Sequence, residues 1–168
     1  MPPITALVHT NNDVLRLGRC LETLYACDEI LIVDHASRDG TLRIAREYGA
    51  RLIEAQPGMH WDRCLRLRSA GWILTLDPHE SLSESLAASL FEWKTEWKAE
   101  WMPDHSDALA LPAFSLFVRE ETVDGWVDIP TAQTRLVPAT WKRWNGALPL
   151  HQPAAIALHG PLLRFIFP

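Results

Sequence analysis

The sequence is short of the features that mark several classes of protein. It has 16 lysine and arginine residues against 21 aspartate and glutamate residues, and the net charge of -5 leaves no concentrated basic face. A nucleic-acid backbone requires such a face, so nucleic acid is not expected as a partner. Low-complexity tracts and internal repeats are also absent, which argues against a disordered chain and against a solenoid.

Long apolar runs and paired cysteines are missing as well. No run approaches the roughly 20 apolar residues that span a bilayer, and the first residues lack the basic and apolar regions of a signal peptide. The cysteines, Cys20, Cys27 and Cys64, are odd in number and lack metal-ligand spacing, so free thiols in a reducing compartment are expected. These features favour a cytoplasmic location, and they leave open a peripheral contact at the inner face of the membrane.

Apolar patterning predicts alternating strands and helices in the N-terminal part of the chain. Apolar runs predict strands at 4–8, 30–33 and 72–76, and a further strand is expected at 51–54. The run at 30–33 is uninterrupted, so this strand is expected to be central and buried on both faces. Spacings of three or four predict helices that begin near Val14, Thr41, Trp61 and Ser81. This order predicts a parallel sheet with helices on both faces and a ligand crevice at the carboxyl ends of the strands.

The last of these helices has the clearest predicted boundaries. Ser81, followed three residues later by Glu84, forms a capping-box pattern, and Pro103 is expected to end the helix. Tryptophans at 93, 97 and 101 continue its apolar stripe, so packing in the core or an interface is preferred to sugar stacking. Beyond Pro103 the pattern weakens to strands at 109–111 and 114–118, and the whole chain, 1–168, is expected to be a single domain.

Two acidic clusters follow predicted strand ends, where such a sheet binds its ligands. In the first, Asp34 ends the second strand, and Asp39 with Gly40 is most simply explained as a cap of the next helix. In the second, Asp77 and His79 are separated by one residue, so in an extended segment both side chains could face one cation. The alternative for the second cluster is a proline turn with solvated Asp77, His79 and Glu80.

The arrangement of these pieces resembles the family 2 glycosyltransferases, in particular the branch that adds sugars to lipopolysaccharide core. The match covers about residues 4–90. The motifs that carry it are Thr10-Asn11-Asn12-Asp13, Cys20-Leu21-Glu22-Thr23-Leu24, and Asp34 followed by Ser37-Arg38-Asp39-Gly40-Thr41.

The resemblance implies a three-layer α/β/α fold of the GT-A, Rossmann-like type with a mostly parallel central sheet. Residues 1–102 would form its nucleotide-sugar-binding half and residues 103–168 a short acceptor-side extension. The residues that match the family's nucleotide-binding positions are Thr10, Asn12, Asp13, Asp34, Ser37 and Asp39. Asp77 and His79 occupy the place of its Asp-x-Asp metal motif, which implies Mn²⁺ or Mg²⁺ as the cofactor; imidazole suits Mn²⁺ better.

Downstream the resemblance is looser. Glu80, Trp126, Arg135 and His151 fall near family elements, while Gln152 stands where the family often has an acid and cannot accept a proton from an acceptor hydroxyl. Asp124 and Asp128 are therefore the candidate bases. Trp141 and Trp144 lie beside Lys142 and Arg143, a pattern consistent with an acceptor-side patch, a membrane contact or a homodimer contact on an exposed loop.

The sequence thus predicts a glycosyltransferase that moves a hexose from a nucleoside diphosphate sugar, UDP-linked by preference, to a glycan or lipid-linked acceptor. A second hypothesis is a degenerate domain that binds nucleotides or other proteins, because substitutions fall on chemistry-bearing positions such as His79, Cys64 and Gln152. A nucleotidyltransferase is a weaker third, because Thr10 to Asp13 is not the glycine-rich basic loop expected of that class.

Overall fold

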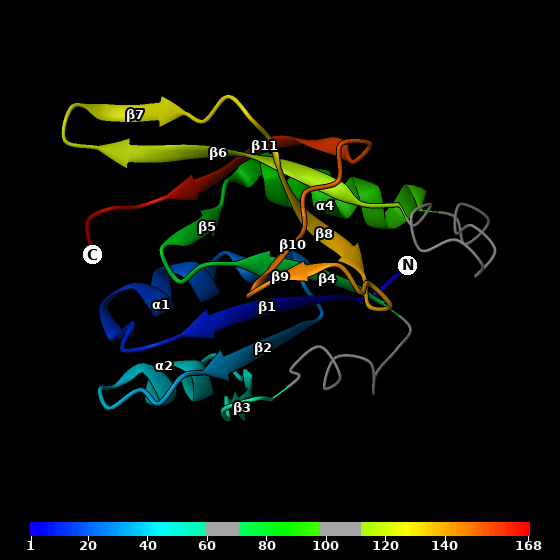
Figure 1. Ribbon diagram of the computed structural model, residues 1–168. Coiled ribbons are helices and arrows are strands. Elements are labelled where there is room, and N and C mark those ends of the chain that lie inside the picture. The colour runs from blue at the N-terminus through cyan, green and yellow to red at the C-terminus, as the bar shows by residue number, and fades with distance from the viewer. Residues whose placement is uncertain (60–70, 98–111) are drawn as a thin grey trace.

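The computed structural model describes residues 1–59, 71–97 and 112–168 and shows one curled sheet with helices packed against it (Figure 1). Its strand order is β3-β2-β1-β4-β8-β6-β11-β5, with β7 paired to β6 outside this path. The strands are β1 (Ile4–Thr10), β2 (Glu29–Asp34), β3 (Arg51–Glu54), β4 (Trp72–Leu76), β5 (Glu80–Leu82), β6 (Phe114–Thr122), β7 (Gly125–Asp128), β8 (Gln133–Pro138) and β11 (Ile156–Arg164).

The N-terminal strands form the parallel part of the sheet, as the sequence predicts. β1 pairs in parallel with β2 on one side and with β4 on the other, and β2 pairs in parallel with β3. Strand β2 is an interior strand, but it lies next to the edge strand β3, and β1 and β4 are nearer the centre. The expectation that β2 is central is therefore wrong, although Leu31 and Ile32 are fully buried on its two faces.

The C-terminal part of the chain completes the same sheet. β8 pairs antiparallel with both β4 and β6, β11 runs parallel to β6, and β5 pairs antiparallel with β11. The α/β fold class is confirmed, with a more mixed sheet than the sequence predicts. The reason is that β8 and β11 belong to the part of the sequence after Pro103, where the apolar pattern is too weak to predict them.

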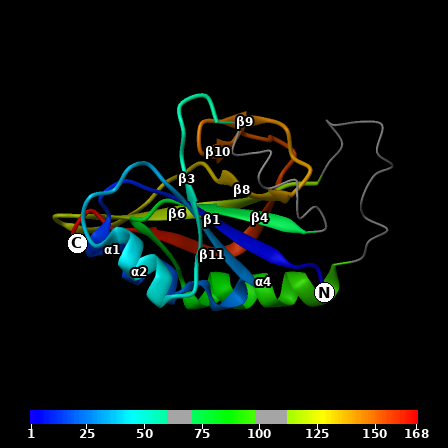
Figure 2. The same ribbon diagram turned by 90° about the horizontal axis from the view of Figure 1, so that it is seen from below.

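The helices of the described ranges lie along one face of the sheet (Figure 2). They are α1 (Val14–Glu22), the short 3-10 helix η1 (Leu24–Ala26), α2 (Thr41–Glu47) and α4 (Glu84–Glu96). Between them and the sheet lies the larger core cluster, which includes Leu17 of α1, Ala45 of α2 and Leu90 of α4. None of these helices is long and apolar enough to cross a membrane.

The opposite face of the sheet is covered by the segment around Trp141 and by the small hairpin of β9 (Trp144–Asn145) and β10 (Leu148–Pro149) (Figure 2). Trp141 is 2% exposed and packs with Leu7 and Val137, and its indole donates to the Arg143 carbonyl at 2.7 Å. Placing Trp141 on an exposed loop was wrong. Its burial removes the sequence basis for a membrane or dimer patch at this position.

Helix α4 begins and ends differently from the prediction. Ser81 lies in strand β5, and the hydroxyl that caps the helix belongs to Ser83, which accepts from the Leu86 amide at 3.2 Å. The helix ends at Glu96, because Trp97 adopts an extended conformation. Gly160 of β11 has φ of +92°, and a Cβ there would lie 2.4 Å from the Leu86 amide nitrogen. Only glycine lets β11 pass so close to the start of α4.

Cys20, Cys27 and Trp93 agree with the sequence analysis, which expects free thiols and a tryptophan packed in the core. Cys20 and Cys27 are free, and burial raises the pKa of both thiols, that of Cys27 to about 12, so neither is reactive. Trp93 is buried in the core. The predicted helix from Trp61 to 69, the predicted strand at 109–111, Cys64 and Trp101 lie outside the described residues.

Trp93 is expected to be a major contributor to stability. Its ring lies edge-on to Trp72 at 4.9 Å and to Phe114 at 5.5 Å, and the side chain is 6% exposed. We predict that Trp93→Ala lowers the free energy of unfolding by about 3–5 kcal/mol, because it removes apolar contacts and leaves a cavity. Phe91→Ala on the exposed side of the same helix should cost less than about 1 kcal/mol. Equal losses in urea unfolding monitored by circular dichroism would contradict this packing.

Candidate functional site

The register of the parallel strands brings the two acidic clusters to one edge of the sheet. Thr10 at the end of β1 is paired with Asp34 at the end of β2, and Val8 of β1 is paired with Leu76 at the end of β4. Asp77 follows Leu76 directly. Because all three strands run in the same direction, the loops that follow them lie side by side at their carboxyl ends.

Asp34 organises the loop after β2. It is 4% exposed, and its carboxylate accepts hydrogen bonds from the Thr10 hydroxyl at 2.7 Å and from the Ser37 amide and hydroxyl at 2.9 and 2.5 Å. A carboxylate has about four acceptor positions, so one is left for a ligand. Asp34 therefore holds the loops after β1 and β2 together and has little capacity beyond that.

The rest of the first cluster cross-links the same two loops. Asn12 has a backbone φ of +56°. Its backbone N–H donates to the Ser37 hydroxyl at 2.9 Å, and its side-chain Oδ1 accepts from the Arg38 backbone N–H at 2.8 Å. Asp39 accepts from the first amides of both helices, Val14 of α1 and Thr41 of α2. Hydrogen bonds from Thr41 lower the pKa of Asp39. The capping interpretation of Asp39 thus agrees with its contacts.

Asp13 completes this cluster from the start of α1. Its amide donates to the Thr41 hydroxyl at 2.8 Å, and its side chain accepts from the Asn11 amide at 2.7 Å. The predicted nucleotide-binding residues are therefore brought together by the fold. Most of their polar groups are used in holding the two loops.

The second cluster forms a tight turn after β4. Asp77 Oδ1 lies 2.5 Å from His79 Nδ1 and also accepts from the His79 amide at 2.9 Å. Both side chains are partly exposed, at 55% for Asp77 and 37% for His79. The two side chains contact each other, and the segment is a turn, as in the alternative interpretation, and not the extended segment assumed for a shared cation.

Glu80 is fully buried, and here the solvated alternative was wrong for this residue. Its carboxylate binds Arg135 of β8 at 2.8 and 3.0 Å and Arg164 of β11 at 2.8 and 3.2 Å. It also accepts from the Asp77 amide at 2.9 Å. Glu80 therefore fixes the turn that carries Asp77 to two strands from the C-terminal part of the chain.

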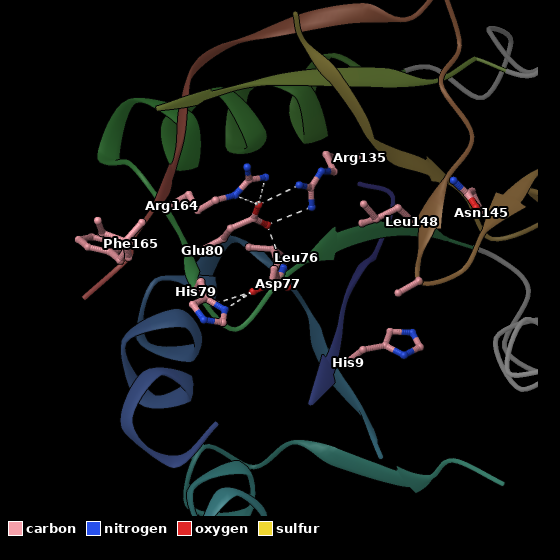
Figure 3. A pocket seen from close by; sticks show the side chains of 12 residues that line it. His9, Leu76, Asp77, His79, Glu80, Arg135, Asn145, Leu148, Arg164 and Phe165 are labelled. Atoms are coloured by element: carbon pink, nitrogen blue, oxygen red, sulfur yellow. Dashed lines mark hydrogen bonds and ion pairs between the residues drawn. The ribbon is translucent and has the colours of Figure 1, made fainter. Parts of the chain in front are cut away.

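These groups line a cavity of about 660 Å³ (Figure 3). Its charged and imidazole lining consists of His9, Asp77, His79, Glu80, Arg135 and Arg164. Leu148 of β10 and Phe165, just after β11, contribute apolar surface on opposite sides of it (Figure 3). A mixed polar and apolar cavity at the carboxyl ends of β1 and β4 is the expected ligand site of such a sheet.

His9 links the cavity to the first cluster. Its Nδ1 lies 2.8 Å from Nε2 of His35, the residue after Asp34, and the rings stack with centroids 5.2 Å apart. Burial, with a smaller effect of His35, lowers the pKa of His9 to about 4. His9 is therefore neutral at pH 7.

The turn offers two donors to a divalent cation. In the described ranges, no group of three or more His, Cys, Asp or Glu side chains could hold a metal ion. Asp77 and His79 supply one carboxylate and one imidazole that face the same cavity, a donor set that fits Mn²⁺ better than Mg²⁺. The fit requires ligand or water oxygens to complete the coordination and requires the contact between Asp77 and His79 to open.

The other predicted site residues lie away from this turn. Asp124 is in the exposed bend between β6 and β7, and Asp128 pairs with Arg119 at 2.6 Å, a contact that lowers the pKa of Asp128. Neither lines the cavity as far as the structure describes it. His151 is on an exposed loop. Trp126 reaches the site indirectly, because its ring lies edge-on to the cavity residue Phe165 at 5.2 Å.

Sequence reasoning missed His9, Arg164 and Phe165 as cavity residues. Arg164 is the single charge in the apolar tail from Leu162 to Phe167, and an isolated charge in such a run could have indicated a buried ion pair. No pattern in the sequence pairs it with Glu80, 84 positions earlier.

The strand order and the crevice at the ends of β1, β2 and β4 define the class. The chain has the GT-A type of α/β fold, and part of its sequence resembles glycosyltransferases. No protein-family model matches it.

Three comparisons carry this result. The lipopolysaccharide core biosynthesis glycosyltransferase LpsC of Rhizobium meliloti (strain 1021) is 41% identical over 46 residues, which cover 27% of this chain and 17% of LpsC. An uncharacterized glycosyltransferase of Rickettsia felis is 31% identical over 92 residues, covering 50% of this chain and 31% of the relative. The crystal structure of S. aureus TarS superposes with a TM-score of 0.50 at 16% identity, covering 82% of this chain and 28% of TarS. The chain thus matches less than a third of the length of each curated relative.

Removing the charge of Glu80 should destabilise the protein strongly. We predict that Glu80→Gln lowers the free energy of unfolding by about 3–5 kcal/mol, because two arginines then lose their buried counter-charge. Glu120→Gln removes a partner of Arg164 that is partly exposed and should cost less than about 1 kcal/mol. Urea denaturation of both variants tests this, and a small loss for Glu80→Gln would show that the cluster is not a stabilising anchor.

The neutral state of His9 predicts a dependence of stability on pH. Above pH 6.5 His9 is neutral in both states, whereas below it the unfolded chain binds a proton that folded His9 resists until about pH 4. Between pH 7 and pH 5, the wild type should lose on the order of 2 kcal/mol more unfolding free energy than His9→Gln. Titrating groups that do not contact His9 contribute equally to both proteins and cancel in the difference. Parallel pH curves for the two proteins would be evidence against a buried neutral His9.

Proposed function

We propose that the chain is a glycosyltransferase domain of the family 2 type. It binds a nucleoside diphosphate sugar, UDP-linked by preference, and supports transfer of its hexose to a glycan or lipid-linked acceptor. The observation that carries the proposal is the meeting of the Asp34 loop with the Asp77-His79 turn at one sheet edge, with the turn open to the cavity. The similarity to named glycosyltransferases supports it.

In this proposal the two clusters bind different parts of the donor. The loops after β1 and β2 bind the nucleoside. Its contacts are the remaining acceptor position of Asp34 and the exposed residues Asn11 and His35. The turn after β4 meets the diphosphate. Mn²⁺ or Mg²⁺ held by Asp77 and His79 would neutralise charge on the departing nucleoside diphosphate. Glu80 keeps the backbone of that turn in place through the Asp77 amide.

The acceptor side is less defined by its geometry. Trp126 borders the cavity through Phe165, which supports a place for it near the acceptor. Asp124 and Asp128 remain the candidate bases on the β6–β7 hairpin, and Asp128 would have to release Arg119 to accept a proton. The cytoplasmic location and any membrane contact or homodimer stay predictions.

A degenerate module that binds nucleotides or proteins is the second candidate. It rests on His79 and Gln152, which replace the acids expected at those positions. The Gln152 amide donates to the Thr134 hydroxyl at 2.9 Å and its side chain accepts from Arg143 at 3.2 Å, so this residue has a structural use. The similarity to glycosyltransferases favours the enzyme.

Nucleotide binding that depends on the metal tests the proposal. We expect UDP to bind more tightly with Mn²⁺ than with EDTA in isothermal titration calorimetry, and Asp77→Asn to weaken binding in Mn²⁺ by about tenfold or more. Glu22→Gln, an exposed change on α1 outside the cavity, should bind as the wild type does. If Mn²⁺ has no effect on UDP binding by the wild type, the metal role of Asp77 and His79 fails. If no nucleoside diphosphate binds, the interaction module is favoured.

A further inference from the structure

Two arginines reach the same cavity wall from distant parts of the chain. Arg135 comes from β8 and Arg164 from β11, and both bind the carboxylate of Glu80 (Figure 3). The two guanidinium groups nevertheless differ in exposure, with side chains 2% exposed for Arg135 and 28% exposed for Arg164.

Arg135 has no donor left for a ligand. A guanidinium carries five N–H groups. Those of Arg135 make five hydrogen bonds, to the Glu80 carboxylate at 2.8 and 3.0 Å, to the Gln133 side chain at 2.8 and 3.2 Å, and to the Thr75 carbonyl at 3.2 Å. Arg135 therefore has a structural role in joining β4 to β8.

Arg164 keeps part of its capacity. Among residues 1–59, 71–97 and 112–168, it makes three hydrogen bonds, two to Glu80 Oε1 at 2.8 and 3.2 Å and one to Glu120 Oε2 at 3.1 Å. With respect to the described part of the chain, its guanidinium therefore retains two N–H groups, one on each terminal nitrogen, while its side chain lines the cavity. The Glu120 contact is partly exposed to water, so it is weaker and more easily exchanged than the buried one.

The charges around the cavity give Arg164 a use. The chain carries a net charge of -5, and an anionic ligand must be met by local cations. Burial lowers the pKa of Arg164, but contacts with Glu80 and Glu120 outweigh it and raise the pKa, so the guanidinium stays charged.

We infer that Arg164 is an anion-binding residue, which gives its free N–H groups to phosphate oxygens of a ligand in the cavity. The phosphate has two possible sources, the diphosphate of the donor or a phosphate on the acceptor. The first source rests on the proposed function and the second does not depend on nucleotide binding. With either source, Glu80 orients the Arg164 guanidinium through its two hydrogen bonds, and Glu120 competes with the ligand for that guanidinium.

The test compares variants with opposite expected effects. Arg164→Gln should weaken binding of a phosphate-bearing probe by roughly 10- to 100-fold, the cost of lost hydrogen bonds to a charged group. Glu120→Gln should strengthen it by about threefold, because it frees the guanidinium from a competing carboxylate. Arg119→Gln, next to Glu120 in β6, removes a cation that does not line the cavity and should have no effect.

Three probes identify the source of the phosphate. Calorimetric titrations with UDP, UMP and inorganic phosphate are performed on the wild type and each variant. An effect of Arg164→Gln that is larger for UDP than for UMP assigns the residue to the donor diphosphate. An effect on inorganic phosphate added to protein saturated with UDP, with UDP binding itself unchanged, assigns it to the acceptor.

Loss of folding is controlled by a second substitution and by melting curves. Arg164→Lys keeps the charge and should retain stability better than Arg164→Gln, with binding between that of Arg164→Gln and the wild type. If folded Arg164→Gln and Arg164→Lys bind UDP and phosphate as tightly as the wild type does, the inference is overturned and the proposed function stands. If the wild type binds phosphate through Arg164 but no nucleotide, the proposed function fails and the inference holds.

Discussion

The buried carboxylate of Glu80 is the interaction on which the site depends. It joins β5 to β8 through Arg135, joins β5 to β11 through Arg164, and holds the amide of Asp77 in the turn between β4 and β5. A fully buried carboxylate is costly unless its charge and acceptor positions are matched, and here two guanidinium groups match them. The position of Asp77 and His79 thus depends on β8 and β11, two strands near the C-terminal end of the sequence.

The sheet consequently combines two parts with different tasks. The parallel strands β1, β2 and β4 place loops at one edge, where the Asp34 cluster cross-links them. Strand β8, which is antiparallel to β4, and strand β11, which is parallel to β6, bring arginines to the same edge. These cations stand out because the net charge of the chain is negative. The proposed binding of a nucleoside diphosphate uses both parts, because the first provides shape and acceptors and the second provides positive charge.

Particular elements show how far the sequence predicts this fold. Strands 4–8, 30–33 and 72–76 were recognisable because a strand buried on both faces is largely apolar along its length. The cap of α4 was assigned to Ser81 instead of Ser83, because Ser81 has a glutamate three residues later and Ser83 does not. Only the pairing of β5 with β11 shows that Ser81 lies in a strand, which leaves the cap to Ser83. Trp141 was misplaced for a similar reason, since the basic residues beside it suggested exposure while its ring fills the second face of the sheet.

By itself the sequence determined the glycosyltransferase-like order of elements, the acidic loops after the second and fourth strands, and the spacing that places Asp77 and His79 in one short segment. These are local features, fixed by periodicity and by residues close together in the chain. Only the tertiary structure decided that Glu80 is buried, that Arg135 and Arg164 neutralise it, and that Arg164 alone of this pair keeps donors on the cavity wall. Ion pairs between distant segments leave no spacing in the sequence, because their geometry exists only once the sheet has closed around them.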